Sequence, residues 1–219
     1  MENHIRPAVL LVGQSGSGKS SSARTLPADK TVIVNVEAKP MPFKEFKDFK
    51  NINIRRHKDY MKLIKELKEA GDKYEYVVID SLTSLLEMAH KYCTSIYSGY
   101  SIYSEYNDLI YNILQDIKDL PQQVFVTAIP DYIEVETGLL RAVPKVKGKE
   151  WANGAIAKEF AIVLNTHLIA DEEGNIVEYQ FDTKPSKTTV GKSPNGMFEE
   201  RYMPNDLKAV SDAIKTYYE

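Results

Sequence analysis

The strongest chemical signal in the sequence is a glycine-rich loop near the N-terminus. Residues 13–20 read Gly-Gln-Ser-Gly-Ser-Gly-Lys-Ser and match the pattern G-x-x-x-x-G-K-[ST] at every position. Glycines in such a loop let successive backbone N–H groups face a chain of phosphates. Lys19 would lie between the β- and γ-phosphates of a nucleotide, and the Ser20 hydroxyl would ligate Mg²⁺. The residues expected to contact the nucleotide here are Gly13, Gln14, Ser15, Gly16, Ser17, Gly18, Lys19, Ser20 and Ser21.

A second chemical signal is an acid at the end of an apolar segment. Asp80 follows Val77-Val-Ile, and an acid at the end of a buried strand is costly unless it has a role. Downstream of a phosphate-binding loop, that role is usually to hold Mg²⁺ through its water shell. The alternative is that Asp80 caps the helix that follows it.

A third candidate is a glutamate that could act as a general base. The residue after Asp80 is Ser81 rather than a second acid, so a catalytic base must come from another segment. Glu37 ends the apolar segment 32–36 and could activate the attacking water. The alternative is a solvated loop acid ahead of Pro40.

The elements that must position these residues follow from the apolar pattern. Short apolar segments bounded by turn residues predict buried strands, and apolar residues at helical spacing predict the segments between them. Because strands alternate with helices up to Pro130, we expect a mostly parallel sheet flanked by helices in an α/β fold. The expected strands are residues 8–12, 31–36, 51–55, 76–80 and 123–129, and the expected helices are residues 19–26, 59–70, 81–95 and 103–120.

The pattern changes after Pro130. Hairpins are expected at 131–141 and 169–183, where Thr137-Gly138 and Glu173-Gly174 provide the turns. We expect residues 131–205 to extend the same sheet in a mostly antiparallel manner. The core would occupy about residues 7–130, and a closing helix would occupy 206–217, so that residues 1–219 form one domain. The remaining elements expected in this part are a strand at 161–169 and a mobile loop at 184–197.

Composition narrows the class of protein. A chain of 219 residues with 43% hydrophobic residues can bury a substantial core, and its net charge of −3 excludes a globally basic nucleic-acid-binding coat. No apolar run is long enough to span a membrane, and the N-terminus does not resemble a secretory signal. The single cysteine, Cys93, cannot form an intrachain disulfide. We therefore expect a cytoplasmic protein with no membrane partner.

Three features together resemble the RecA-type recombinases: the loop at 13–20, the strand that ends in Asp80-Ser81, and Glu37 at the end of the strand that follows the loop. The chain is more closely similar to the short RecA-core ATPases of bacteriophages. These are the Sak-type single-strand annealing proteins, often described only as phage nucleotide-binding or AAA-domain proteins. The matching segments are Glu37-Ala-Lys-Pro, Ile79-Asp-Ser-Leu, Val126-Thr-Ala and Lys192-Ser-Pro-Asn-Gly-Met-Phe.

The resemblance implies a RecA-like P-loop NTPase fold and Mg²⁺-dependent ATP hydrolysis stimulated by DNA. It implies Lys19, Glu37 and Asp80 as the catalytic residues, with Ser20 and Asp80 at the metal. Single-stranded DNA would be the main partner, in a homo-oligomeric ring or short filament, with a single-strand DNA-binding protein as a further partner. A phage-encoded protein of this kind would work in the cytoplasm of the host cell.

Further roles follow from the same resemblance. Thr127 is the polar candidate for sensing the γ-phosphate from the strand at 123–129, the alternative being a threonine packed in the sheet. Loops after this strand line a DNA groove in RecA-type proteins, where cations would follow phosphates and a ring would stack on bases. The alternative is a solvated hairpin tip with a half-buried tryptophan. The DNA-binding candidates are Arg141, Lys145, Lys147, Lys149 and Trp151.

Two later lysines and a group of tyrosines have less specific interpretations. Lys187 and Lys192 could reach the γ-phosphate of a neighbouring subunit, or they could be solvated loop lysines. The tyrosines between residues 92 and 111 fit either a packed helix pair or a contact with another subunit or nucleic acid.

Two other nucleotide-dependent functions compete with recombination. A small-molecule or nucleoside kinase has a similar length and the same loop, but it needs a lid with several arginines, and the six arginines here form no such cluster. A GTPase would carry Asn-Lys-x-Asp, and the nearest segment, Asn165-Thr-His-Leu, lacks both the lysine and the aspartate. The kinase therefore remains the alternative function.

Overall fold

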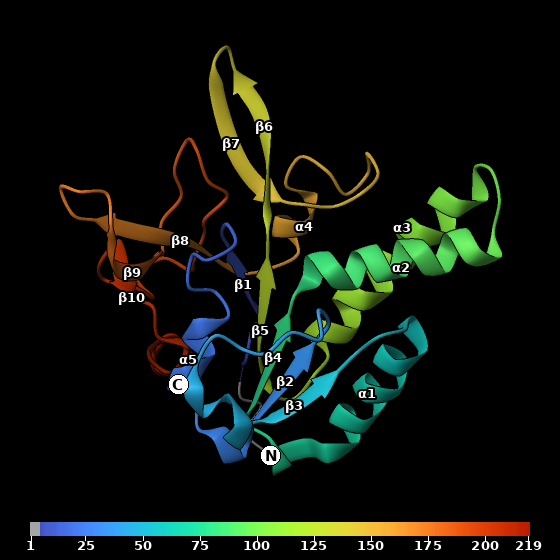
Figure 1. Ribbon diagram of the computed structural model, residues 1–219, viewed down its shortest axis with the longest axis horizontal. Helices are drawn as coiled ribbons and strands as arrows, with labels where there is room; N and C mark the ends of the chain where they lie inside the picture. Colours follow the sequence, from blue (N-terminus) through green and yellow to red (C-terminus); the bar gives the residue numbers. More distant parts are fainter. Residues whose placement is uncertain (1–4) are drawn as a thin grey trace.

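A central sheet of eight strands organises the protein (Figure 1). The structure is a computed structural model and describes residues 5–219. The strand order is β10-β9-β8-β1-β5-β4-β2-β3, and the six strands from β8 to β3 are parallel. β9 runs antiparallel to β8, and β10 runs antiparallel to β9. The strands are β1 (Val9–Val12), β2 (Thr31–Asn35), β3 (Lys50–Asn53), β4 (Tyr76–Asp80), β5 (Gln123–Ala128), β8 (Ile162–Ala170), β9 (Ile176–Asp182) and β10 (Tyr202–Pro204).

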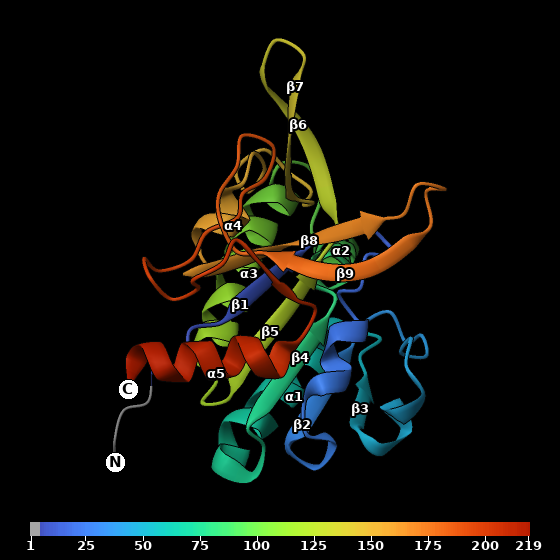
Figure 2. The ribbon, with the colours of Figure 1, turned by 90° about the vertical axis from the view of Figure 1, so that its left-hand side faces the viewer.

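Helices cover both faces of the sheet, which explains why the inner strands are apolar throughout. On β1, Leu10 and Val12 pack into the core layer beneath the long helices, whereas Val9 and Leu11 pack into the layer on the other face. Figure 2 shows α5 lying in front of the strands with α3 behind them. The first face carries α1 (His57–Ala70), α2 (Leu82–Ile96), α3 (Ser101–Lys118) and α4 (Ala155–Lys158); the second carries α5 (Leu207–Tyr218) and the 3₁₀ helices η1 (Ser21–Thr25), η2 (Ala28–Lys30) and η3 (Lys44–Asp48).

The parallel core predicted from the sequence is confirmed, but the helix expected at residues 19–26 is wrong. The chain forms only the 3₁₀ helix η1 (Ser21–Thr25) there. Two hydroxyls compete for backbone carbonyls, because Ser22 Oγ donates to Lys19 O at 2.6 Å and Thr25 Oγ1 donates to Ser22 O at 3.0 Å. Leu26 is extended ahead of Pro27, which ends the turn.

The C-terminal part differs from the expected extension in two respects. The first hairpin, β6 (Pro130–Glu136) and β7 (Leu139–Pro144), forms a separate two-stranded sheet rather than part of the central one. The strand β8 pairs with β1 in parallel, so this part also contributes a parallel strand. The second expected hairpin is formed by β8 with β9. Sequence periodicity indicates which segments form strands, but it does not indicate which neighbour each strand pairs with in the sheet.

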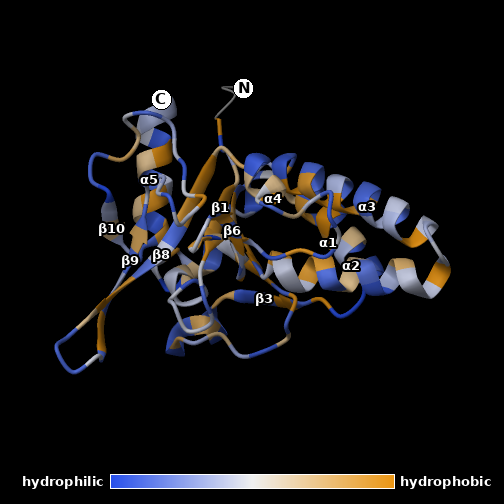
Figure 3. Cartoon of the chain, turned by 90° about the horizontal axis from the view of Figure 1, so that it is seen from above, coloured by the Kyte–Doolittle hydropathy of each residue, from blue (hydrophilic) through white to orange (hydrophobic). Residues whose placement is uncertain are grey.

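The hydropathy of the residues follows the arrangement of the sheet between two layers of helices. Viewed from above, the inner strand β1 is hydrophobic and the edge strand β3 is hydrophilic, and the long helices alternate between hydrophobic and hydrophilic residues (Figure 3). Within residues 5–219, no helix has both the length and the apolar character needed to cross a membrane.

Candidate functional site

The glycine-rich loop joins β1 to η1 and needs glycine for its conformation. Gly16 and Gly18 have φ values of +78° and +91°, in the left-handed region that favours glycine. A Cβ atom on Gly13 would lie 1.9 Å from Thr166 Oγ1, and one on Gly18 would lie 2.8 Å from Tyr179 Cδ1. The loop is therefore packed tightly against β8 and β9.

Lys19 lies at the end of this loop, and its side chain folds back over it. The residue is 7% exposed, and its Nζ donates to Gln14 O at 2.7 Å. Burial lowers the pKa of Lys19, and the negative charges of Asp80 and Glu37 act in the opposite direction. A phosphate would be a stronger acceptor than this carbonyl, because its oxygens carry negative charge that attracts the ammonium group.

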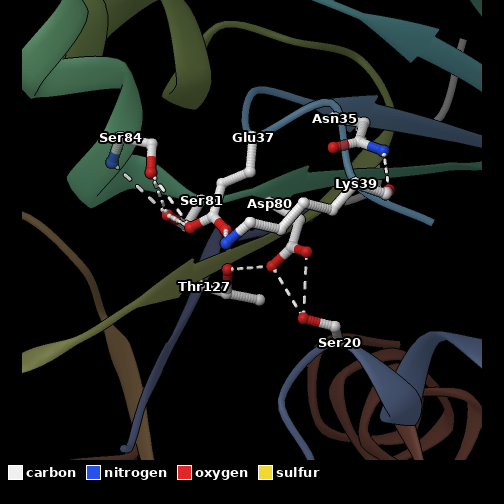
Figure 4. A network of polar contacts seen from close by, with 8 residues as sticks. All are labelled: Ser20, Asn35, Glu37, Lys39, Asp80, Ser81, Ser84 and Thr127. Atoms are coloured by element: carbon white, nitrogen blue, oxygen red, sulfur yellow. Dashed lines mark hydrogen bonds and ion pairs between the residues drawn. The ribbon is translucent and has the colours of Figure 1, made fainter. Parts of the chain in front are cut away.

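The carboxylate of Asp80, at the carboxyl end of β4, accepts hydrogen bonds from two hydroxyl groups (Figure 4). Ser20 Oγ lies 3.0 and 2.9 Å from the two carboxylate oxygens, and Thr127 Oγ1 donates to Oδ1 at 2.5 Å. The parallel pairing of β4 with β5 brings Thr127 to Asp80, and Ser20 comes from the end of the glycine-rich loop. The arrangement offers a carboxylate and a hydroxyl as oxygen ligands.

Glu37 lies on the other side of Asp80, because β2 pairs with β4 and places Asn35 opposite Asp80. Its Oε1 accepts from Ser84 Oγ at 3.1 Å and from Ser81 Oγ at 3.4 Å, and its Oε2 pairs with Lys39 Nζ at 2.6 Å (Figure 4). The hydrogen bond from Lys39 is the main cause of a lowered pKa for Glu37, which the two serine hydroxyls lower further. The carboxylate is therefore ionised at neutral pH, as a general base must be.

These residues share one cavity of about 430 Å³. Lys19, Glu37 and Asp80 all line it, so the structure brings the three predicted catalytic residues together. Residues 39–42 and Tyr179 form other parts of its wall. The loop residues that line it are Ser15, Gly16, Gly18, Lys19, Ser20 and Ser21. Gly13, Gln14 and Ser17 instead line a neighbouring cavity of about 300 Å³, and Thr127 reaches the site through Asp80.

Several residues of this site were not expected from the sequence. Lys39 lies only two residues after Glu37, and this spacing is a local signal that the two side chains are close. Ser84 lies one helical turn after Ser81, which is the N-cap of α2 and accepts from Ser84 N at 3.3 Å. Thr166 and Tyr179 come from β8 and β9, and no local sequence pattern connects them with the loop.

The DNA-binding candidates lie after the carboxyl end of β5, on the same edge of the sheet as the glycine-rich loop (Figure 1). Lys145, Lys147 and Lys149 are exposed. Their loop is held on α3 by a hydrogen bond from Asn107 to Glu150. Trp151 is half-buried against the core, and within the described residues its Nε1 has no hydrogen-bond partner. Its ring is therefore less available for stacking than an exposed one.

The remaining candidates lie outside the cavity that holds Lys19. Lys187 is exposed, and its carbonyl accepts from Arg141 Nε at 3.0 Å. Lys192 Nζ donates to Lys158 O at 3.2 Å. Of the tyrosines between residues 92 and 111, Tyr106 is buried, whereas the others are partly or fully exposed around the turn that joins α2 to α3.

Comparison with known proteins agrees with this geometry. A protein-family model described as "AAA domain" matches residues 6–194, which include the glycine-rich loop, Glu37, Asp80 and Thr127. No curated protein matches the chain. The match covers most of the chain, and the site contains the phosphate-binding loop and the acidic strand end that nucleotide hydrolysis requires. The chain therefore belongs to the AAA-domain family and is a P-loop NTPase, a domain that binds and hydrolyses nucleotides.

Proposed function

We propose that this protein hydrolyses Mg²⁺-ATP and acts in phage DNA recombination, where it binds and anneals single-stranded DNA. The observation that carries the proposal is the meeting of Lys19, Asp80 and Glu37 in one cavity beside the phosphate loop. The DNA component rests on the exposed lysines at the same edge of the sheet and on the resemblance to short RecA-core proteins.

The oxygen donors around Asp80 fit Mg²⁺, which is usually bound by one or two protein ligands together with water and phosphates. Residues 5–219 contain no group of three His, Cys, Asp or Glu side chains placed to hold a metal, and a Mg²⁺ site of this kind does not need one. Ser20 would hold the ion directly, and Asp80 would hold it through water. The bound ion would offset negative charge on the β- and γ-phosphates.

Three side chains of the protein would carry out the other parts of ATP hydrolysis. Lys19 would stabilise the charge that develops on the transferred phosphoryl group. Glu37 would position the attacking water and accept its proton, while the hydroxyls of Ser81 and Ser84 fix the orientation of the carboxylate. Thr127 would act through Asp80, to which it is hydrogen-bonded.

Asp80→Asn is expected to weaken Mg²⁺-dependent ATP binding by about 10–100-fold, the usual effect of losing an outer ligand of a metal. Asparagine can still accept hydrogen bonds from Ser20 and Thr127, so the fold should persist. The measurement is a titration with a fluorescent ATP analogue at a series of Mg²⁺ concentrations, with thermal unfolding as a check on the fold.

The matched control is Asp182→Asn, which removes a carboxylate at the end of β9 that pairs with Arg201 and does not line the nucleotide cavity. This control should keep the wild-type dependence on Mg²⁺. If Asp80→Asn also keeps that dependence, Asp80 does not hold the metal.

The DNA component needs several subunits. The protein is acidic overall, so binding must come from local cations, and one subunit can contact only a few phosphates. A homo-oligomer, as a ring or short filament, would multiply these contacts along the strand. A single-strand DNA-binding protein is a further partner that fits this function, and Lys187 could reach the nucleotide of a neighbouring subunit.

Charge reversal at Lys147 and Lys149 together is expected to weaken binding of single-stranded DNA and to reduce its salt dependence. Both side chains belong to the exposed loop after β7. The measurement is fluorescence anisotropy with a labelled oligonucleotide at several salt concentrations, with and without Mg²⁺-ATP. Duplex DNA should bind less well than single-stranded DNA.

The control for charge is Lys62→Glu with Lys65→Glu, which changes two exposed lysines on α1 by the same amount. This pair should leave DNA binding close to that of the wild type. If the wild-type protein binds no single-stranded DNA at low salt, with or without nucleotide, the kinase alternative gains support. Incubation with ATP and candidate phosphoryl acceptors would then test it.

A further inference from the structure

A second cavity, of about 440 Å³, lies between the β6–β7 hairpin, α4 and the segment of residues 185–192. The segment is held against β7, because Ala142 N donates to Thr188 O at 2.8 Å and Ala142 forms a bridge with Thr189. These three parts of the chain come together at the edge of the sheet that carries the phosphate loop (Figure 1). We refer to this space as the basic cavity.

Three cations from three different segments line the basic cavity. Arg141 comes from β7, Lys158 from α4 and Lys192 from the late segment, and no Asp or Glu is among the lining residues. Within residues 5–219, none of the three forms an ion pair with a carboxylate within 4.0 Å, whereas Lys39, Lys68 and Arg201 do.

The hydrogen bonds of these cations go to neutral groups. Arg141 Nε donates to the carbonyl of Lys187, and Lys192 Nζ donates to the carbonyl of Lys158. The acid whose charge acts on Lys192 is Glu159, and Glu159 already pairs with Lys118 Nζ at 2.8 Å. Among the residues that the structure describes, no carboxylate is therefore paired with the positive charge of the basic cavity.

Burial raises the energetic cost of leaving these cations without an anionic partner. Lys192 is partly buried, and the loss of solvent lowers the pKa of its ammonium group. A desolvated cation whose protein partner is a carbonyl gains more from an anion than an exposed lysine does. Ser186 and Thr189 also line the cavity, and their hydroxyl oxygens are hydrogen-bonded to each other at 2.9 Å, so one of the two hydroxyls could donate to the same anion. Ile133 supplies an apolar wall.

We propose that the basic cavity binds a phosphate group of the single-stranded DNA backbone, held by Arg141, Lys158 and Lys192. The inference rests on the DNA component of the proposed function and names where the strand contacts the protein. A strand seated here would lie across the opening bordered by the hairpin, α4 and residues 185–192, and it would continue toward the exposed lysines after β7. Lys192 would then serve DNA binding rather than the nucleotide of a neighbouring subunit.

The position of the cavity favours DNA over a free nucleotide. The cavity is open and lies apart from the one that holds Lys19, Glu37 and Asp80. Thr189 lines both the basic cavity and the neighbouring cavity beside Gln14. Gln14 Nε2 donates to the Tyr132 hydroxyl of the hairpin at 2.8 Å, so the hairpin contacts the phosphate loop. A strand held here would therefore lie close enough to respond to the nucleotide.

The test combines Lys158→Ala with Lys192→Ala and, separately, uses Arg141→Ala. The measurement is the affinity for a labelled single-stranded oligonucleotide as a function of salt. Each phosphate contact removed should reduce the slope of log K against log salt by about one. Lys192→Arg keeps the charge and should restore most of the binding that Lys192→Ala loses. The matched control is Lys62→Ala with Lys65→Ala on α1, which should keep the wild-type slope.

The outcomes separate this inference from the proposed function. If the variants of the basic cavity bind DNA with the wild-type affinity and slope while reversal of Lys147 and Lys149 weakens binding, the DNA function stands and this site is wrong. A loss of affinity for ATP with unchanged DNA binding would also overturn it, because the anion would then be a nucleotide. If the wild-type protein binds no single-stranded DNA, the proposed function fails first. Thermal unfolding identifies any variant that fails to fold, and Lys158→Ala alone, at an exposed residue, then carries the test.

Discussion

Replacing Lys19 with alanine is expected to reduce ATP hydrolysis by about 10²–10³-fold or more while the protein remains folded. The ammonium group is the positive charge that the chain places over the phosphate loop, and removing one such stabilising group costs about this much in turnover. In the structure its hydrogen bond goes to the carbonyl of Gln14, and the residue lines the nucleotide cavity. The measurement is phosphate release at saturating Mg²⁺-ATP, with thermal unfolding recorded for both proteins.

The control is Lys62→Ala, which removes an exposed lysine on α1 and should keep wild-type turnover. A folded Lys19→Ala protein that hydrolyses ATP at the wild-type rate would show that the phosphate loop does not serve the reaction. An unfolded variant would show instead that the loop needs Lys19 for its structure, and Lys19→Met, which keeps most of the side chain, would then replace it.

The candidate residues of the nucleotide cavity could be predicted because each one follows a recognisable local sequence pattern, either the glycine-rich loop or an apolar segment. Asp80 and Glu37 follow apolar segments that become parallel strands, and the carboxyl ends of parallel strands meet at one edge of a sheet. The pairing of β2 with β4 brings Glu37 toward Asp80, with Asn35 opposite Asp80. Local spacing indicates the candidate residues, and the parallel pairing of the strands brings them to one edge of the sheet.

The parts that could not be predicted depend on long-range packing. Thr166 and Tyr179 restrict Gly13 and Gly18, yet both come from strands that follow the loop by more than a hundred residues. Their place depends on β8 joining β1 in parallel, and strand periodicity does not specify this edge. The short 3₁₀ helix after the loop depends on competing hydroxyl hydrogen bonds, which helical spacing does not reveal.

The basic cavity also could not be predicted from the sequence, because it depends on contacts between distant segments. The sequence alone indicates separate roles for Arg141 and Lys192, because they lie in two different segments of the chain. It gives no signal for Lys158, which follows an apolar segment without a motif. The bridge between Ala142 on β7 and Thr189 brings the two segments together, and an isolated bridge to an irregular segment leaves no periodic signal.

Glu37→Gln is expected to keep ATP binding and lose about 10²–10⁴-fold in turnover, the usual contribution of a general base. Glutamine has nearly the same shape, and its carbonyl oxygen can still accept from Ser81 and Ser84, so the cavity should keep its form. It cannot accept the proton of the attacking water. Binding is measured with a fluorescent ATP analogue, and turnover is measured in a single-turnover experiment, so that chemistry is separated from product release.

The dependence of turnover on pH gives the same prediction a second measurement. Lys39 is the main cause of the lowered pKa of Glu37, so the wild-type carboxylate should stay ionised below the ordinary range for glutamate. Lys39→Met removes this partner, so the pKa of Glu37 should rise and the acidic limb of the turnover profile should move to higher pH. Glu45→Gln, at an exposed site on η3, should change neither turnover nor the profile. If Glu37→Gln hydrolyses ATP normally, the base lies elsewhere, and the hydrogen bonds from Ser81 and Ser84 to Glu37 serve only the structure of the loop.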